Sequence, residues 1–154
     1  MSIEIRRLTA GDAAIAAEAI ARLKTTDNAR GTRRIEAPDV SNVFLAEPRN
    51  ILIAAFLEGR AIGFTIGYVL DRVERTTPMV LLYEIEVASE HRRRGVARGM
   101  ITKLREIARE VGAYKVWVLT DRENEAARGL YRATGGLEVG ENLLIEYAAG
   151  ASDL

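Results

Sequence analysis

The stretch EHRRRGVARGM, residues 90–100, places four arginines around two glycines. It follows LLYEIEVA, residues 81–88, whose β-branched and aromatic side chains predict a strand. After it, apolar residues recur with the period of a helix: Ala97, Ile101, Leu104, Ala108 and Val111. The arginine–glycine stretch therefore lies between the end of a strand and the first turn of a helix.

A strand-to-helix junction of this composition predicts an anion site. The first N–H groups of a helix have no partner within it, and the helix dipole adds partial positive charge there. Gly95 lets the backbone approach a phosphate, and the arginines add charge-assisted hydrogen bonds. A diphosphate is the expected guest, and the lack of a Gly-Lys-Ser/Thr sequence argues against a nucleoside triphosphate. The alternative is a solvated basic loop at the start of a helix.

The composition limits the remaining possibilities. The chain has 154 residues, carries 22 Lys+Arg against 22 Asp+Glu, and has no cysteine. This balance predicts no general attraction to nucleic acid or to a membrane surface, and the lack of thiols excludes cysteine nucleophiles and thiolate metal sites. With no signal-peptide core and no long apolar run, we expect a soluble cytoplasmic protein with a single domain over residues 1–154.

The remaining elements follow from periodicity and turn residues. Strands are predicted at residues 3–8 and 115–120, and helices at 13–24, 38–46 and 124–134. Residues 51–57 and 61–70 form a predicted hairpin, residues 71–78 a loop, and residues 137–139 and 142–148 a closing antiparallel pair. The element order β-α-α-β-β-β-α-β-α-β-β predicts a mixed α/β (α+β) layer structure.

Two motifs carry a family resemblance. The run Arg92-Arg93-Arg94-Gly95-Val96-Ala97 resembles the Arg/Gln-x-x-Gly-x-Gly/Ala signature of the GNAT superfamily of N-acetyltransferases. The run from Asn124 through Ala127 to Tyr131 resembles the second signature of that family, Asn-x-x-Ala-x-x-x-Tyr before a glycine. Both motifs stand where that fold places them, and the resemblance spans roughly residues 3–147.

The resemblance implies a GNAT fold, with flanking helices and a mixed central sheet whose fourth and fifth strands splay apart. It also implies acetyl-CoA as the acetyl-donor cosubstrate, with its pyrophosphate on the arginine–glycine loop and its pantetheine arm along the fourth strand, and no metal. The residues expected to bind it are Ile85, Val87, Arg92, Arg93, Arg94, Gly95, Val96, Ala97, Arg98, Asn124 and Ala127. The backbone N–H of Val87 is the implied oxyanion donor.

Acetyl transfer to an amine needs a base, an oxyanion donor and an acid for the leaving thiolate. By resemblance Tyr131 is the acid, although its spacing from neighbouring apolar residues also suits a core aromatic. Strict alternation places Glu84 and Glu86 on one face of their strand with Leu82, and Tyr83 on the other face. Glu84 is the first candidate for the base and Glu86 the second, with a bulge expected near Glu86.

A finer resemblance concerns the acceptor. Tyr83-Glu84, His91-Arg92-Arg93 and Glu146 resemble features of the aminoglycoside 3-N-acetyltransferases, including the gentamicin-modifying ones. Glu84 stands where an aspartate is expected, and Glu86 is an added carboxylate. The resemblance implies direct attack by an aminoglycoside amine in a ternary complex, substrate contacts at Tyr83, Glu84 and Glu146, and antibiotic resistance.

Other functions stay open on the sequence alone. One alternative is a peptide, protein or polyamine N-acetyltransferase, and another is a non-catalytic acyl-CoA sensor. The expected partner is a small cationic amine, and a homodimer through the closing strands is possible.

Overall fold

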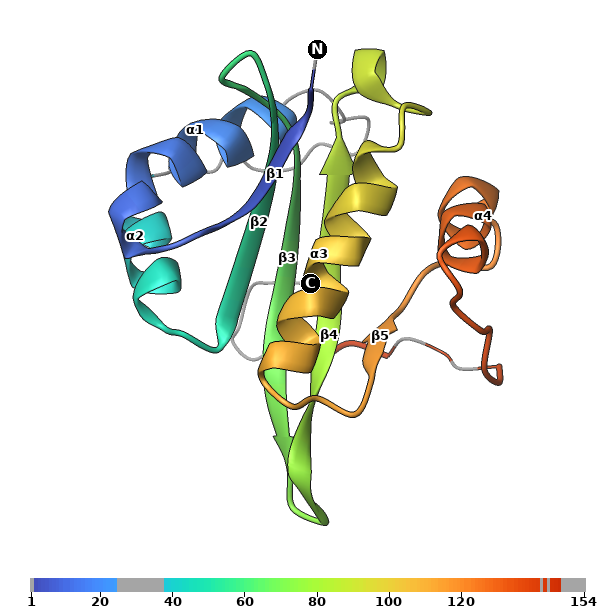
Figure 1. Cartoon of the computed structure of the whole chain (residues 1–154). Helices are drawn as coiled ribbons and strands as arrows, with labels where there is room; N and C mark the ends of the chain where they lie inside the picture. The colour runs from blue at the N-terminus through green and yellow to red at the C-terminus, as the bar shows by residue number, and fades with distance from the viewer. Residues whose placement is uncertain (1, 25–37, 142, 144, 148–154) are drawn as a thin grey trace.

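The computed structural model describes residues 2–24, 38–141, 143 and 145–147. A five-stranded sheet in the order β1-β2-β3-β4-β5 forms its centre (Figure 1). The strands are β1 (Glu4–Leu8), β2 (Asn50–Leu57), β3 (Arg60–Arg72), β4 (Arg75–Val87) and β5 (Val116–Val118). The first four strands pair antiparallel, and β5 pairs parallel to β4. The predicted mixed sheet is therefore confirmed.

Helices cover both faces of this sheet. The helices are α1 (Ala13–Lys24), α2 (Pro38–Ala46), α3 (Val96–Glu110) and α4 (Glu125–Ala133), and two short 3-10 turns are η1 (Ala10–Asp12) and η2 (Ser89–His91). In Figure 1, α3 crosses in front of the sheet, α1 and α2 lie at its β1–β2 side, and α4 stands apart beyond β5. Both α1 and α2 have the bounds that periodicity predicts, so those two predictions are confirmed.

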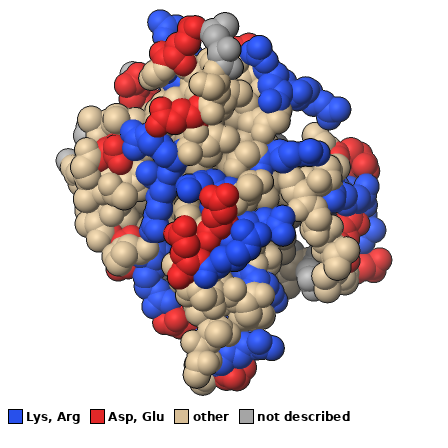
Figure 2. Space-filling model, viewed as in Figure 1, with Lys and Arg blue, Asp and Glu red and all other residues tan. Residues whose placement is uncertain are grey.

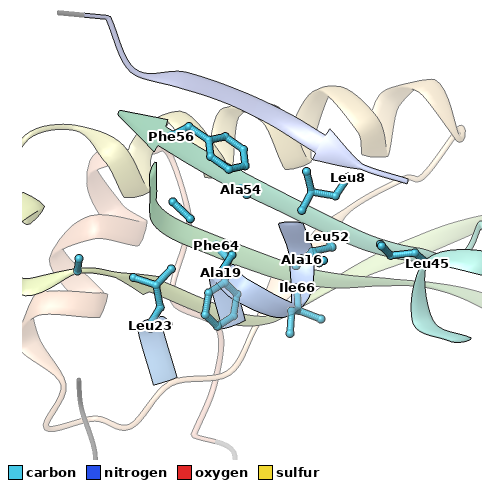
Figure 3. Close-up of a cluster of buried hydrophobic side chains, with 12 residues drawn as sticks. Leu8, Ala16, Ala19, Leu23, Leu45, Leu52, Ala54, Phe56, Phe64 and Ile66 are labelled. Carbon is cyan, nitrogen blue, oxygen red and sulfur yellow. The ribbon is translucent and has the colours of Figure 1, made fainter. Parts of the chain in front are cut away.

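Two separate clusters of buried side chains divide the core by face. On the α1 face, Ala19 and Leu23 pack with Phe64 of β3 (Figure 3). On the α3 face, Met100 and Leu104 pack with residues of β2 and β4. The sheet is thus a partition with an apolar layer on each side, and a strand residue can be assigned to a face by the cluster it joins.

The β3–β4 hairpin is longer than predicted. Residues 71–78 were expected to form a loop, but only residues 73–74 turn, and Arg72 pairs with Arg75. Thr76 and Thr77 are polar but β-branched, and β-branched residues are compatible with an exposed strand end. The guanidinium of Arg75 stacks over the ring of Tyr114, 4.2 Å from its centroid, which adds a cation–π contact to this end.

The predicted closing strand pair is wrong for the described residues. None of residues 134–141, 143 and 145–147 lies in a strand, and five apolar side chains there are 69–89% exposed: Leu137, Val139, Leu143, Ile145 and Tyr147. Alternation indicates a strand only where a neighbouring backbone can pair with it, and β5 offers an edge of three residues. The carboxylate of Glu138 instead accepts hydrogen bonds from Arg128 and Arg132, which hold this segment against α4.

A candidate active site at the gap between β4 and β5

A gap opens between β4 and β5 partway along the sheet. The two strands pair only at Val80↔Val116, Leu81↔Trp117 and Leu82↔Val118, after which β5 ends while β4 continues to Val87. The β4 edge that faces β5 therefore loses its neighbour beyond Leu82. This is the predicted splay of the fourth and fifth strands.

A β-bulge sits where the gap begins. In the register of β3 with β4, Ile66 pairs with Glu84 and Gly67 pairs with Leu82, so Tyr83 has no partner. The bulge was expected near Glu86, and that position is wrong. A side chain on Gly67 would come within 3.0 Å of a Leu104 methyl carbon, so the glycine permits the close approach of β3 to α3 beside the bulge.

The bulge changes which side chains share a face. Leu82 belongs to the α3-face cluster, whereas strict alternation grouped it with the glutamates. Tyr83 lies on the α1 face, where its ring meets Tyr68 edge-on at 5.5 Å. The predicted placement of Tyr83 on the face opposite the glutamates is therefore wrong, because the bulge interrupts the alternation. Glu86 pairs across from Phe64, which is in the α1-face core, so the glutamates share the α1 face as predicted.

The Glu84 carboxylate forms an ion pair with Lys24, a residue that no sequence motif indicated. The Lys24 Nζ lies 3.0 Å from Glu84 Oε2, and the two side chains are 33% and 23% exposed. Lys24 is the last residue of α1, and the buried Leu23 beside it fixes that end of the helix against the sheet. On the same face, burial raises the pKa of Tyr68, and the nearby Tyr83 and Glu84 add to this effect. The α1 face of the gap thus already accommodates a primary ammonium.

The arginine–glycine loop folds into a turn suited to an anion. Arg93 has φ +62° and Gly95, the N-cap of α3, has φ +82°, so two left-handed residues flank Arg94. Backbone turns of this kind direct N–H groups inward toward one point. Val96 is buried and fixes the start of α3, while the guanidiniums of residues 92–94 are exposed. Lys and Arg side chains gather over this end of the molecule (Figure 2, upper right).

Two side chains of this loop make contacts within the protein. Arg92 Nε donates to the Val87 carbonyl oxygen at 3.1 Å, which ties the loop to the end of β4. Arg94 Nη1 lies 3.3 Å from His91 Nδ1. Arg92 therefore positions the loop, and Arg93, Arg94 and Arg98 present exposed cationic side chains at the surface.

The second motif builds and orients α4. Asn124 Oδ1 accepts a hydrogen bond from the Ala127 N–H at 3.0 Å and caps the helix, so both residues have a structural role. Tyr131 is half-buried against the α3-face cluster, and this burial raises the pKa of its phenol. Tyr131 and Glu84 consequently approach the gap from opposite faces of the sheet.

A groove of about 480 Å³ runs between α3, β5 and α4, and the surface in Figure 2 is hollowed there. Its lining includes Leu82 and Val118, the last pair before the gap, together with Tyr131. Trp117, also in the lining, has a buried indole N–H with no hydrogen-bond partner among the described residues. Apolar walls, an unpartnered donor and a cationic loop fit the pantetheine arm and diphosphate of acetyl-CoA.

Some predicted contacts are not assembled. Glu146 is exposed in the closing segment, and no described contact joins it to the β4 carboxylates. The sequence TTDNARGTRRIEAPD, residues 25–39, is expected to border the acceptor site, and residues 25–37 of it lie outside the described residues. Within the described part of the chain no cluster of His, Asp and Glu is suited to a metal ion, and no helix is long and apolar enough to span a membrane.

The fold is shared with solved acetyltransferases. An aminoglycoside acetyltransferase, meta-AAC0020, from an uncultured soil metagenomic sample and in complex with sisomicin, is 22% identical with a TM-score of 0.88, over 96% of this chain and 97% of that one. A second aminoglycoside acetyltransferase, HMB0005, also from an uncultured soil metagenomic sample, is 27% identical with a TM-score of 0.79, over 96% and 100%.

Sequence comparison identifies human relatives and the family. Human N-acetyltransferase 8 is 24% identical over 110 residues, 71% of this chain and 48% of that protein, so the chain spans about half the length of the curated relatives it matches. Residues 17–135 match the acetyltransferase (GNAT) family, and this match covers most of the chain, including both motifs. The chain belongs to the acetyltransferase (GNAT) family.

Proposed function

We propose that the protein transfers acetyl from acetyl-CoA to a primary amine of an aminoglycoside, at the 3-amino group, by direct attack in a ternary complex. The observation that carries this proposal is the placement of Glu84 and Tyr131 on opposite faces of the gap between β4 and β5. A donor bound on the α3 face can then meet an acceptor bound on the α1 face.

On the donor side, the residues supply binding and a proton. The N–H groups around Gly95 and the exposed arginines hold a diphosphate, and the β4 edge beyond Leu82 offers backbone groups to an extended arm. When bound, acetyl-CoA supplies the thioester carbonyl that the amine attacks. The Val87 N–H is the proposed donor to the developing oxyanion, and the Tyr131 hydroxyl is the proposed acid for the departing sulfur.

On the acceptor side, Glu84 binds the amine and takes its proton. The Lys24 contact supports this role, because it shows that a primary ammonium fits against Glu84. Glu86 lies on the same face of β4 and contributes further negative charge. Two carboxylates and the aromatic rings of Tyr83 and Tyr68 suit a compact polyamine, and an aminoglycoside is a polycation of this kind. The two similar aminoglycoside acetyltransferases support the same substrate class.

The test is thiol release from acetyl-CoA with a panel of gentamicin, sisomicin, kanamycin, spermidine and short basic peptides. We expect rapid release with gentamicin and sisomicin, and fragment-ion analysis of the product should place the acetyl on the 3-amino group. Expression in a susceptible bacterium should raise the inhibitory concentration of the reactive drugs.

Other outcomes would redirect the proposal. Thiol release only with spermidine or with the peptides would support an N-acetyltransferase but show that its acceptor is not an aminoglycoside. Acetyl-CoA binding without release across the panel would favour an acyl-CoA sensor over an enzyme that acts on these amines. Acetylation at another position of the drug would keep the substrate class and correct the regiospecificity.

A further inference from the structure

Lys24 stands in the place that the proposed reaction assigns to the acceptor amine. Its Nζ lies 3.0 Å from Glu84 Oε2, the oxygen of the proposed base. Glu84 directly follows the bulge residue Tyr83, and Leu82 is the last β4 residue paired with β5. The base therefore lies two residues beyond the opening of the gap, and the Lys24 amine lies against that base.

The packing of α1 restricts the position of the Lys24 amine. Ala16, Ala19 and Leu23 are buried against the sheet, so the final turn of α1 is fixed while the Lys24 side chain reaches over β4. The pair itself is partly exposed, at 33% and 23%. Ion pairs this accessible to water contribute little to stability, so the ammonium can leave the carboxylate easily.

We propose that Lys24 is a self-acetylation site, a built-in acceptor that the enzyme modifies when no external amine is present. This inference rests on the proposed function. Glu84 takes a proton from the Lys24 ammonium, and the neutral Nζ then attacks the thioester carbonyl carbon. The new N–C bond forms as the C–S bond breaks, and the sulfur leaves as free thiol with a proton from the Tyr131 hydroxyl. The second proton that the nitrogen loses returns through solvent to the Tyr131 oxygen, and Glu84 gives the proton it took to solvent. Acetyl-lysine carries no charge, so the restored Glu84 carboxylate no longer has its ion-pair partner.

The chain contains its own matched control. It has three lysines, Lys24, Lys103 and Lys115, beside nineteen arginines, so the number of acetylable side chains is small. Lys103 Nζ lies 3.2 Å from Glu106 Oε2, and its side chain is 34% exposed, against 33% for Lys24. The two amines therefore match in exposure and in having a carboxylate partner, but Lys103 lies on α3 beside Ile5 of β1. Simple chemical reactivity toward the thioester would modify both alike.

The experiment incubates the full chain with [¹³C]acetyl-CoA and no acceptor, and follows each lysine by intact mass and peptide mapping. We expect one acetyl group at Lys24, gained at least about tenfold faster than at Lys103, because only Lys24 is held against the base and beside the gap. Glu84→Gln should reduce the Lys24 rate to that of Lys103. Sisomicin in excess should slow Lys24 modification, since both amines require Glu84.

The Lys24→Arg variant separates this role from a purely structural one. Arginine keeps the charge and the carboxylate contact but offers no acetylable amine, so the variant should fold and gain no rapid acetyl group. Equal rates at Lys24 and Lys103, or a Lys24 rate unaffected by Glu84→Gln, would overturn the inference.

The amine panel, run beside this experiment, keeps the two proposals apart. Turnover of sisomicin without Lys24 modification would remove the self-acetylation and leave the proposed function. Modification of Lys24 without turnover of any panel amine would support the inference and show that the external acceptor was misjudged.

Discussion

At the scale of single residues, the site depends on Tyr83, the one β4 residue that the pairing with β3 skips at the bulge. Because Tyr83 has no partner in β3, the face of β4 changes between Leu82 and Glu84. The bulge thereby directs Leu82 into the α3-face core and Glu84 toward Lys24. Bulges commonly re-aim side chains next to active sites. Without the bulge, strict alternation would place Glu84 and Leu82 on the same face of β4.

The two glutamates of β4 can be distinguished by substitution. Glu84→Gln keeps the shape of the side chain but removes the proton acceptor, so kcat should fall about 100-fold. The rise of rate with pH on the acid side should also flatten. The measurement is the pH–rate profile of kcat with sisomicin, and Glu86→Gln is the matched control because it removes the same charge on the same face. Flattening in Glu86→Gln alone would assign the base to Glu86.

Tyr131→Phe tests the acid on the other face. Loss of the hydroxyl should lower kcat about 100-fold while the KM for acetyl-CoA changes little, because a proton donor acts in the transition state. Burial raises the pKa of the Tyr131 phenol, which keeps the proposed acid protonated at neutral pH. Tyr114→Phe, which removes a hydroxyl beside Arg72, is the control. An unchanged rate in Tyr131→Phe would leave the tyrosine as a core aromatic only.

Sequence reasoning reached some of these residues and not others. Glu84, Glu86 and Tyr131 stand out by alternation and motif, and the structure places all three around the gap region. Lys24 was missed because its partner is sixty residues away, and no local pattern reports a contact over that separation. Its only sequence signal is rarity, as one of three lysines. The bulge position was missed because neither glycine nor proline marks it in β4.

At the scale of elements, the N-terminus of α3 depends on a left-handed residue. Gly95 has φ +82°, and a Cβ there would meet nothing within 4 Å, so alanine would strain the backbone without a clash. Gly95→Ala should lower the free energy of unfolding by about 1 kcal/mol. It should also raise the KM for acetyl-CoA, because the N–H groups of the loop would shift.

Thermal unfolding and KM measurements check this expectation. Gly11→Ala is the control, since Gly11 also has open space around its Cα but no left-handed φ. Gly11→Ala should lose no stability, because alanine restricts the unfolded chain and fits the folded one. An equal loss of stability in both variants would mean that the left-handed turn does not set the cost. An unchanged KM for acetyl-CoA in Gly95→Ala would show that this loop does not contribute to binding of the acetyl donor.

The contact of α4 with the segment after it should respond to acid. Hydrogen bonds from Arg128 and Arg132 lower the pKa of Glu138 from 4.5 to about 2. A lowered pKa means that the stabilisation is fully present above pH 4.5 and is lost as the pH falls from there toward 2. The protection factors of the Gly135 and Gly136 N–H groups, each taken relative to the intrinsic exchange rate at that pH, should fall over this range and be lower in Glu138→Gln at neutral pH. Identical exchange in the wild type and Glu138→Gln would show that the glutamate does not hold this segment.

Element prediction succeeded where the pattern was self-contained. The amphipathic periods of α1 and α3 and the Glu58-Gly59 turn between β2 and β3 all act over a few residues, and the structure has them where expected. The prediction of the closing strands failed because a strand needs a neighbouring strand, and the local sequence around Leu137 and Val139 does not indicate whether one is available. The prediction of a loop between β3 and β4 failed for the converse reason. Pairing across a short turn orders polar residues whose sequence is typical of a loop.

At the scale of the whole molecule, the sheet separates two approaches to one opening. The groove under α4 and the arginine–glycine loop lie toward α3, whereas Glu84 and Lys24 lie toward α1. In Figure 1 the same division appears as α3 in front of the sheet, with α1 and α2 on its other side.

This division has a consequence for steady-state kinetics. Free CoA should inhibit competitively against acetyl-CoA and noncompetitively against the amine, because the proposed function places CoA and the amine on different sides, where both can be bound at once. The same dead-end complex predicts substrate inhibition at high aminoglycoside, as drug bound beside CoA delays CoA release. Initial-rate matrices of both substrates with added CoA would reveal it, and a parallel-line pattern would instead indicate an acetylated enzyme intermediate. In the proposed mechanism, the partition therefore predicts that release of CoA, and not access of the acceptor, limits turnover at high aminoglycoside.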